Sequence, residues 1–279
     1  MIGMGLGTSI TTLNIGLVHE FVEDLRNSSI VTFELGEETF RHDYDRAVRA
    51  HFLQMLQETG KKAYSYHFPF AVYENLASLD EVERHRAVSR FRAVLQEAFS
   101  LGCKLMVIHS ATGPVDQTRR AEHVQAVRQS LREVEFDLKT FGMKAALEYL
   151  PGGCIGNSVE NLQEIWEGFD DTFGCCLDVN HLGKKVMELP QIVHALGPKL
   201  LTTHISTCEG YTEQHLMPLP GKEGIIPWKE LFTALQEISY QGPFNFETHL
   251  NKEIEFADRI RELEMCFDSL VKKYFVPLG

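Results

Sequence analysis

Eight short apolar runs alternate with longer stretches of mixed polarity along the whole chain, and this alternation restricts the fold more than any other feature. The runs span residues 2–9, 30–36, 62–68, 104–110, 143–150, 174–179, 200–206 and 242–250. Short apolar runs separated by longer segments are typical of parallel strands that alternate with helices. The pattern therefore predicts an α/β protein in which each of eight strands is followed by a helix.

The stretches between the runs carry the spacing of amphipathic helices. Residues 43–60, for example, place Val48, Phe52 and Met55 on one face before Gly60, a plausible stop. Further helices are expected at residues 116–142, 158–169, 226–242 and about 253–273. No linker or change in composition divides the chain. These features predict one domain over residues 1–279, a single (β/α)8 TIM barrel with outer helices around eight parallel strands.

A doubly wound sheet is the competing fold. That fold would normally show a glycine-rich first turn, and the sequence GMGLGTS near the N-terminus is too short and too poorly placed to be a dinucleotide fingerprint. The barrel is therefore the favoured architecture.

Composition restricts the partners and the compartment. The formal net charge of −12 disfavours a general polyanion binder, so nucleic acid is not the expected partner. No apolar run reaches 18 residues, and the first residues lack the basic lead of a signal peptide. The six cysteines show no C-x-x-C spacing. We expect a cytoplasmic protein with reduced thiols and no membrane span. A basic stretch at residues 84–92 is expected to be the solvated outer face of a helix.

The ends of the runs carry the chemistry. In a parallel barrel all strands point their last residues towards one mouth, where active sites lie. Seven successive runs end in a titratable side chain that can ligate a metal. In chain order these are Glu34, His67, His109, Glu148, Asp178, His204 and Glu247, with His181 three residues after Asp178 and His249 two residues after Glu247. One such residue alone would be better explained as a turn or an ion-pair partner.

Together, these residues point to a metal ion. Several carboxylates that converge on a partly buried mouth repel each other and lose hydration unless a cation lies among them. The strongest candidates are Glu148, Asp178, His204 and Glu247. This four-residue group offers three carboxylates and one imidazole, a mixed oxygen and nitrogen set that suits a divalent ion. We therefore expect it to hold Mn²⁺, Mg²⁺, Co²⁺ or Zn²⁺.

The segments around these four residues resemble a known superfamily. ALEYL, LDVNH, HIS and FNFETH are similar to motifs of the xylose-isomerase-like TIM barrels, as are YHFPF, VIHS and PLPGKEGIIPW. The resemblance spans the whole chain. The superfamily includes sugar and sugar phosphate isomerases and epimerases, inosose dehydratases and the endonuclease IV repair enzymes. The motifs are specific for the superfamily and much less specific for the reaction.

Similarity to the epimerases implies a metal-dependent isomerase or epimerase whose partner is a small carbohydrate. The four-residue group would hold the ion, and the ion would hold a carbonyl and a hydroxyl of an open-chain sugar, sugar phosphate or polyol. Glu148 and Glu247 would be the catalytic acid/base pair around a metal-stabilised enediolate. The substrate-binding candidates are His67, His109, His181, His215 and Glu34. Trp228, Phe68 and Phe70 are candidates for an apolar wall or for the core.

Similarity to endonuclease IV implies a different use of the same residues, a multi-zinc phosphodiesterase that acts on abasic DNA. Its three-zinc ligands match His67, His109, Glu148, Asp178, His181, His204, His215 and Glu247. Glu213 stands where that family has aspartate, a departure from its pattern. Three features favour the sugar enzymes. The start lacks the nuclease His and Gly-Gly pair, the second run ends FELG, and residues 34–45 are too acidic for a phosphate backbone.

Some alternatives stay open at this point. Many epimerases carry an arginine in the loop after the seventh strand, whereas residues 207–217 contain none and His215 lies there instead. An inosose dehydratase-like lyase and a non-catalytic sugar binder also fit the motifs. Barrels of this superfamily often pair or form tetramers, so a homo-oligomer is compatible with the resemblance.

Overall fold

Eight parallel strands form one sheet in the order β7-β6-β5-β4-β3-β2-β1-β8. The computed structural model describes residues 4–10, 13, 16–40, 45–249 and 253–277. The strands are β1 Leu6–Ser9, β2 Thr32–Leu35, β3 Lys62–His67, β4 Leu105–Ile108, β5 Lys144–Glu148, β6 Phe173–Asp178, β7 Leu200–His204 and β8 Phe244–Phe246. Each predicted apolar run overlaps one strand.

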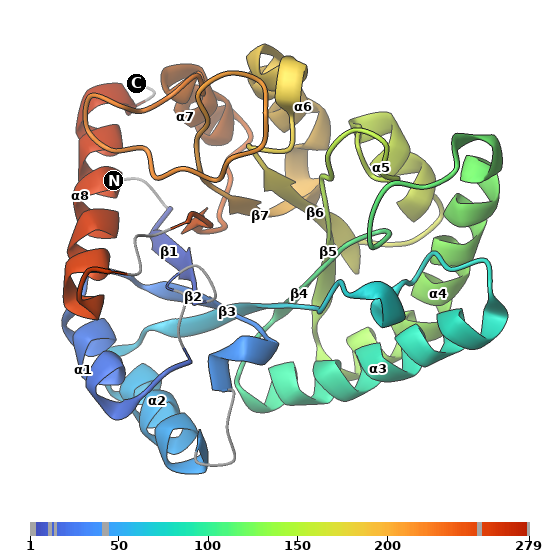
Figure 1. The fold of residues 1–279 in the computed structure, drawn as a ribbon, viewed down its shortest axis with the longest axis horizontal. Helices are drawn as coiled ribbons and strands as arrows, with labels where there is room; N and C mark the ends of the chain where they lie inside the picture. The colour runs from blue at the N-terminus through green and yellow to red at the C-terminus, as the bar shows by residue number, and fades with distance from the viewer. Residues whose placement is uncertain (1–3, 11–12, 14–15, 41–44, 250–252, 278–279) are drawn as a thin grey trace.

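The sheet closes on itself between β7 and β8. Ile205, directly after β7, pairs in parallel with Phe246. Its backbone N–H donates to the carbonyl of Asn245 at 2.8 Å, and its carbonyl accepts from the N–H of Glu247 at 3.0 Å. Figure 1 shows the strands at the centre with the helices around them. The predicted (β/α)8 TIM barrel is therefore confirmed.

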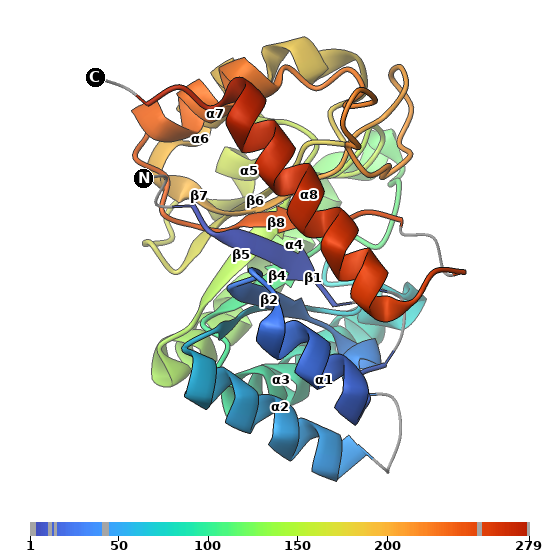
Figure 2. The ribbon, with the colours of Figure 1, turned by 90° about the vertical axis from the view of Figure 1, so that its left-hand side faces the viewer.

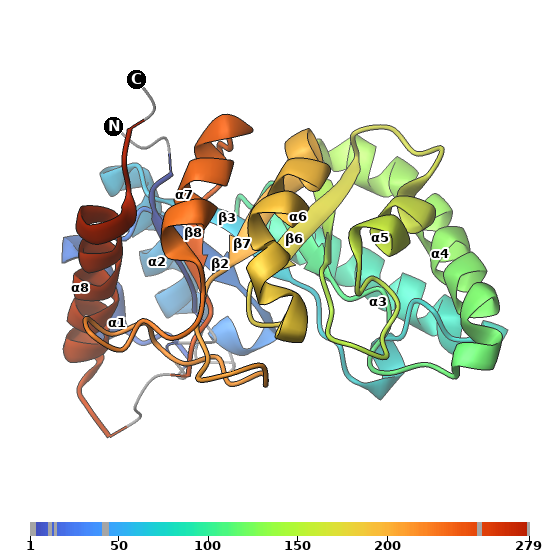
Figure 3. The same cartoon turned by 90° about the horizontal axis from the view of Figure 1, so that it is seen from above.

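Eight α-helices lie outside the strands in the described part of the chain (Figure 3). They are α1 His19–Asn27, α2 Asp45–Thr59, α3 Glu81–Ser100, α4 Arg120–Phe141, α5 Val159–Trp166, α6 Leu189–Leu196, α7 Trp228–Glu237 and α8 Phe256–Tyr274. Ser158 caps α5 by accepting from the N–H of Asn161, and Gly142 ends α4 with a φ of 62°. No described helix is both long enough and apolar enough to cross a bilayer.

The last helix joins the first and completes the outer layer. Phe256 of α8 stacks on Phe21 of α1 with their ring centroids 4.1 Å apart. The guanidinium of Arg259 donates to the carbonyl of Leu13 at 2.8 Å, which ties α8 to the segment after β1. Figure 2 shows α8 running beside β1 and β8 with α1 next to it. The ring of helices thus closes at the same place as the sheet.

An apolar floor fills the barrel below the strand ends. Leu105, Val107, Ala146 and Cys176 form a buried cluster there, with Tyr64 packed against it. The Tyr64 hydroxyl donates to the carbonyl of Leu201 at 2.9 Å and so connects β3 to β7. Ala146 and Cys176 each lie two residues before a strand-end carboxylate, so this apolar layer lies on the same face of the strands as Glu148 and Asp178.

Residues 84–92 are not simply a solvated face, so that prediction is wrong in part. Arg84 is fully buried between α3 and α4. Its guanidinium donates to Glu133 at 2.6 Å, to Glu81 at 2.8 Å and to Ser130 at 3.2 Å. Two of these partners lie on α4, 46 and 49 residues further along, so local sequence could not reveal them.

Candidate metal centre

The carboxyl ends of four strands bring the four-residue group together. Glu148, Asp178 and His204 are the last residues of β5, β6 and β7, and Glu247 follows β8 directly. One possible ligand atom from each lies within 4.8 Å of the others. Three of these side chains are buried, whereas Glu247 keeps 24% of its side-chain surface exposed. The group therefore lies at the base of the mouth and is open on the side of Glu247.

The spacing within the group suits ligands of one ion. His204 Nδ1 lies 2.8 Å from Glu247 Oε2, 3.7 Å from Glu148 Oε1 and 4.0 Å from Asp178 Oδ2. Oxygen and nitrogen ligands at about 2.0–2.2 Å from a tetrahedral ion lie roughly 3.5 Å apart. The four side chains need little movement to meet such an ion.

Unpartnered buried atoms give a second reason to place a cation here. Within the described part of the chain, Asp178 Oδ2 and both ring nitrogens of His204 are buried and make no aligned hydrogen bond, although carboxylates lie 2.8 Å from Nδ1 and 3.0 Å from Nε2. Buried polar atoms of folded proteins are nearly always paired, and exceptions need an explanation. A divalent cation among these residues would satisfy the carboxylate and one imidazole nitrogen together.

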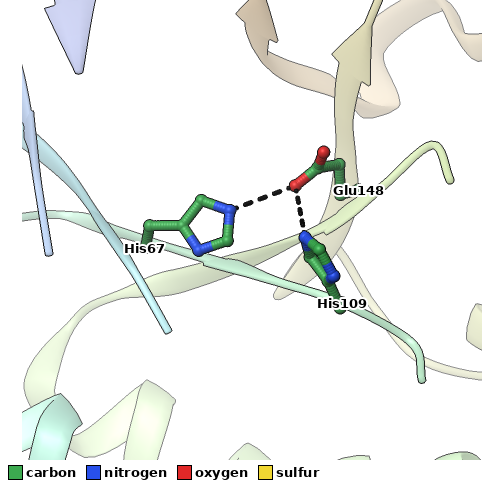
Figure 4. Close-up of side chains that lie close together, drawn as sticks. All are labelled: His67, His109 and Glu148. Atoms are coloured by element: carbon green, nitrogen blue, oxygen red, sulfur yellow. Dashed lines mark hydrogen bonds and ion pairs between the residues drawn. The ribbon is translucent and has the colours of Figure 1, made fainter. Parts of the chain in front are cut away.

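A second ligand group shares Glu148. It comprises His67, His109 and Glu148 and is called the β3–β4 group here. Figure 4 shows both imidazoles pointing at one carboxylate oxygen: Glu148 Oε2 lies 3.2 Å from His67 Nε2 and 3.0 Å from His109 Nε2. The His67 Nδ1–H donates to the carbonyl of Phe68, which fixes the ring and turns Nε2 towards the mouth.

A third ligand group shares Asp178. It comprises Asp178, His181 and His215 and is called the loop group, because His215 lies in the loop between β7 and α7. His181 Nε2 lies 3.7 Å from Asp178 Oδ2, and Glu213 lies outside the group, 3.1 Å from His215 Nε2. His215 has a φ of +47°, a strained conformation for a side-chain-bearing residue. Such strain collects at functional sites, where the surroundings enforce it.

Asn180 holds the loop group in place. Its Nδ2 donates to Ser206 Oγ at 2.9 Å and to the carbonyl of Thr207 at 2.8 Å, and its Oδ1 accepts from the N–H of Gln214 at 2.9 Å. Its own N–H donates to Asp178 at 2.6 Å. One buried amide therefore joins the end of β6 to the loop. The motif LDVNH did not indicate this role, because the partners of Asn180 lie 26 to 34 residues further along the chain.

The charges of the site balance each other. Burial alone would lower the pKa of His67, but the hydrogen bond and charge of Glu148 outweigh burial and raise it to about 9. Burial also opposes protonation of His181, yet the Asp178 charge raises its pKa to about 10. For Glu247, burial is outweighed by the charge of His204, and the pKa falls to about 2. Protonated imidazoles thus compensate part of the negative charge, whereas burial raises the pKa of Asp178. A cation would displace protons from its ligands.

Glu34 and two of the three aromatic candidates are buried, whereas Phe70 is exposed. Glu34 is fully buried, with Oε1 3.0 Å from His204 Nε2, and it contacts this proposed ligand directly. Phe68 and Trp228 belong to the core. Phe70 is 54% exposed and stacks on His109 with centroids 4.3 Å apart. Phe70 alone of the three can form an apolar wall at the mouth.

Sequence comparison finds similarity both to a sugar epimerase and to a protein named as an endonuclease, the two kinds of enzyme that the motifs resemble. The family described as xylose isomerase-like TIM barrel matches residues 22–264. An uncharacterized protein of Methanocaldococcus jannaschii is 27% identical over 218 residues, 76% of this chain and 72% of that protein. A D-psicose 3-epimerase of Enterocloster bolteae is 28% identical over 182 residues, 61% of this chain and 56% of the epimerase. A protein named Probable endonuclease 4, from Solibacter usitatus, is 34% identical over 114 residues, 39% of each chain.

Solved structures share the architecture over nearly the whole chain. An IolI protein with a bound zinc atom superposes with a TM-score of 0.79 at 20% identity, covering 98% of this chain and 100% of that one. A D-tagatose 3-epimerase-like protein gives a TM-score of 0.76 at 22% identity, covering 97% and 99%. At these identities the similarity shows a common fold.

Proposed function

Because the chain belongs to the xylose isomerase-like TIM barrel family, we propose that it is a divalent-metal-dependent isomerase or epimerase of a sugar, sugar phosphate or polyol. The observation that carries the proposal is the four-residue group, which combines three carboxylates and one imidazole at the mouth. The D-psicose 3-epimerase relative supports the substrate class.

The proposed chemistry is proton transfer between two carboxylates. A cation held by the four-residue group would place positive charge beside a substrate carbonyl and make the neighbouring C–H more acidic. Glu148 ends β5 and Glu247 follows β8, and these strands are not neighbours in the sheet. The two carboxylates therefore approach the mouth from different sides. One takes the proton from carbon, and the other returns it to the opposite face or to the adjacent carbon.

Other side chains at the mouth would bind and orient the substrate. His67, His109 and His181 present ring nitrogens beside the carboxylates and can donate to hydroxyl oxygens. The exposed ring of Phe70 covers His109 and can pack on the apolar face of a sugar. These contacts would hold the reacting carbon near Glu148 and Glu247.

Proton exchange with solvent tests this function. The protein loaded with Mn²⁺ is incubated in deuterated water with ketoses, their phosphates and polyol-derived ketones, and the carbons beside the carbonyl are examined by NMR. We expect deuterium at one of these carbons for at least one substrate. A protein that binds the metal and exchanges no proton in any of them would contradict the proposal.

A second candidate function is a multi-zinc phosphodiesterase. The β3–β4 group and the loop group favour it, because they share Glu148 and Asp178 with the four-residue group and so extend it. The similarity to the endonuclease 4 relative points the same way. Against it, Glu37 and Glu38 follow β2 as exposed acids on a chain of net charge −12.

Zinc content and DNA incision separate the two candidates. The phosphodiesterase requires about three zinc ions per chain by plasma mass spectrometry and cleavage of a duplex that contains an abasic site. One bound ion together with intact DNA would exclude it. Three ions with cleavage, and no proton exchange in any sugar, would replace the first proposal.

A further inference from the structure

We propose that Glu34 is a positioning residue, whose carboxylate holds the His204 ring so that Nδ1 faces the cation. This inference rests on the metal-binding part of the proposed function and is independent of the reaction catalysed. It assigns Glu34 a role beneath the mouth instead of the substrate contact expected from the sequence.

The His204 ring lies between Glu34 and the other ligands. Glu34 Oε1 is 3.0 Å from Nε2 on one edge of the ring. On the other edge, Nδ1 is 2.8 Å from Glu247 and 3.7 Å from Glu148. A histidine that binds a metal through one nitrogen carries its proton on the other, and a carboxylate that accepts this proton fixes both the tautomer and the ring. Glu34 is placed to be that carboxylate.

Glu34 is itself held rigidly. Its side chain is fully buried, and its Oε2 accepts from the hydroxyl of Ser65 at 2.8 Å. The β2–β3 register shifts between Phe33 and Glu34, so that Phe33 pairs with Ala63 and Glu34 with Ser65. Such irregularities re-aim side chains near active sites. Here the shift sets the serine hydroxyl opposite the carboxylate.

The other carboxylate oxygen of Glu34, Oε1, faces His204 Nε2. Within the described residues, Glu34 Oε1 is buried and makes no aligned hydrogen bond. A buried carboxylate is costly unless a charge or donor compensates it. His204 Nε2 is the ion-pair partner found within 4 Å in the described part of the chain, and it also lacks an aligned hydrogen bond. The two unpartnered atoms therefore complement each other.

Metal affinity and metal spectroscopy test the inference without using activity. Purified wild type, Glu34→Gln and Glu34→Leu are titrated with Mn²⁺ and Co²⁺ by calorimetry, and the Co²⁺ absorption spectrum reports the ligand geometry. Loss of such a supporting carboxylate typically weakens metal binding by about 10–100-fold. We expect at least a threefold higher Kd and an altered Co²⁺ spectrum for Glu34→Gln, with a larger effect for Glu34→Leu. Glu230→Gln, an exposed carboxylate on α7, serves as the matched control.

Failure of this inference about Glu34 can be distinguished from failure of the proposed function. A folded Glu34→Gln variant that keeps the wild-type Kd within threefold and the wild-type Co²⁺ spectrum overturns the inference. If Glu34→Leu does not fold, the same criterion applied to Glu34→Gln decides. A wild type that binds neither ion would instead refute the metal centre on which the proposed function depends.

Discussion

At the scale of single residues, Glu247 is the ligand that combines ionisation with access to the mouth. Its side chain is 24% exposed, whereas Glu148 and Asp178 are almost completely buried. Without a cation, the positive charge of His204 outweighs burial and lowers the pKa of Glu247 to about 2, and a bound cation would favour the ionised form in the same way. The carboxylate is therefore ionised at neutral pH and able to accept a proton from a substrate carbon.

Glu247→Gln tests that role. The amide keeps the size of the side chain but cannot accept the proton, and positioned general bases contribute about 10²–10⁴-fold to rate. We expect proton exchange to fall by that factor at saturating Mn²⁺, with Glu230→Gln unchanged. Exchange within tenfold of wild type in a metal-loaded Glu247→Gln protein would remove Glu247 from the acid/base pair.

At the scale of elements, the loop between β7 and α7 depends on the end of β6. Glu213 and His215 lie in this loop, and the side chain of Asn180 makes three hydrogen bonds to it. The strained backbone of His215 needs such support, because an isolated loop would relax to a negative φ. The loop group is therefore held together by a residue that is not one of its ligands.

Asn180→Ala should release the loop. The change removes the three bonds and leaves the N–H of Gln214 and the carbonyl of Thr207 without this partner, which costs about 2–3 kcal/mol of unfolding free energy. We expect faster amide exchange over residues 207–216 by mass spectrometry and a lower urea midpoint. Ser206→Ala removes one bond and should have a smaller effect. Unchanged exchange in the loop would show that other contacts hold it.

The pairing of α3 with α4 depends on a buried arginine. Arg84→Ala leaves Glu133 without its closest partner, and breaking buried pairs typically costs 3–5 kcal/mol. Glu81 is 61% exposed and Glu133 28%, so water compensates part of the loss and we expect about 2–3 kcal/mol. Urea unfolding measures it, and the exposed Arg86→Ala is the control. Equal losses in the two variants would contradict a specific role for burial.

At the scale of the whole molecule, the sequence predicted which residues lie at the strand ends, but it did not predict the contacts that orient them. Parallel strands in a barrel must end at one mouth, so the positions of Glu148, Asp178 and His204 followed from the alternating pattern. The position of Glu34 behind His204 did not, because it depends on side-chain direction and on a register shift that local sequence does not encode. The role of Glu34 in substrate binding, expected from its place at a strand end, stays a prediction.

The charge of the mouth also affects overall stability. Without a cation, the ionised carboxylates of Glu148 and Glu247 depend on neighbouring imidazoles for compensation. A ligand present at 100 times its Kd adds about 2.7 kcal/mol to the unfolding free energy. For a chain of 279 residues, we expect chelation to lower the Tm by about 4–6 °C. Calorimetry with and without a chelator measures this. Asp178→Ala should lose the response, and an unresponsive wild type would argue against a bound ion.

Anomalous X-ray diffraction from crystals grown with Mn²⁺ would locate the ion relative to the four proposed ligands. We expect a peak about 2.0–2.3 Å from oxygens of Glu148, Asp178 and Glu247 and from Nδ1 of His204. A map with no peak among these four side chains, in crystals that contain the ion, would contradict it.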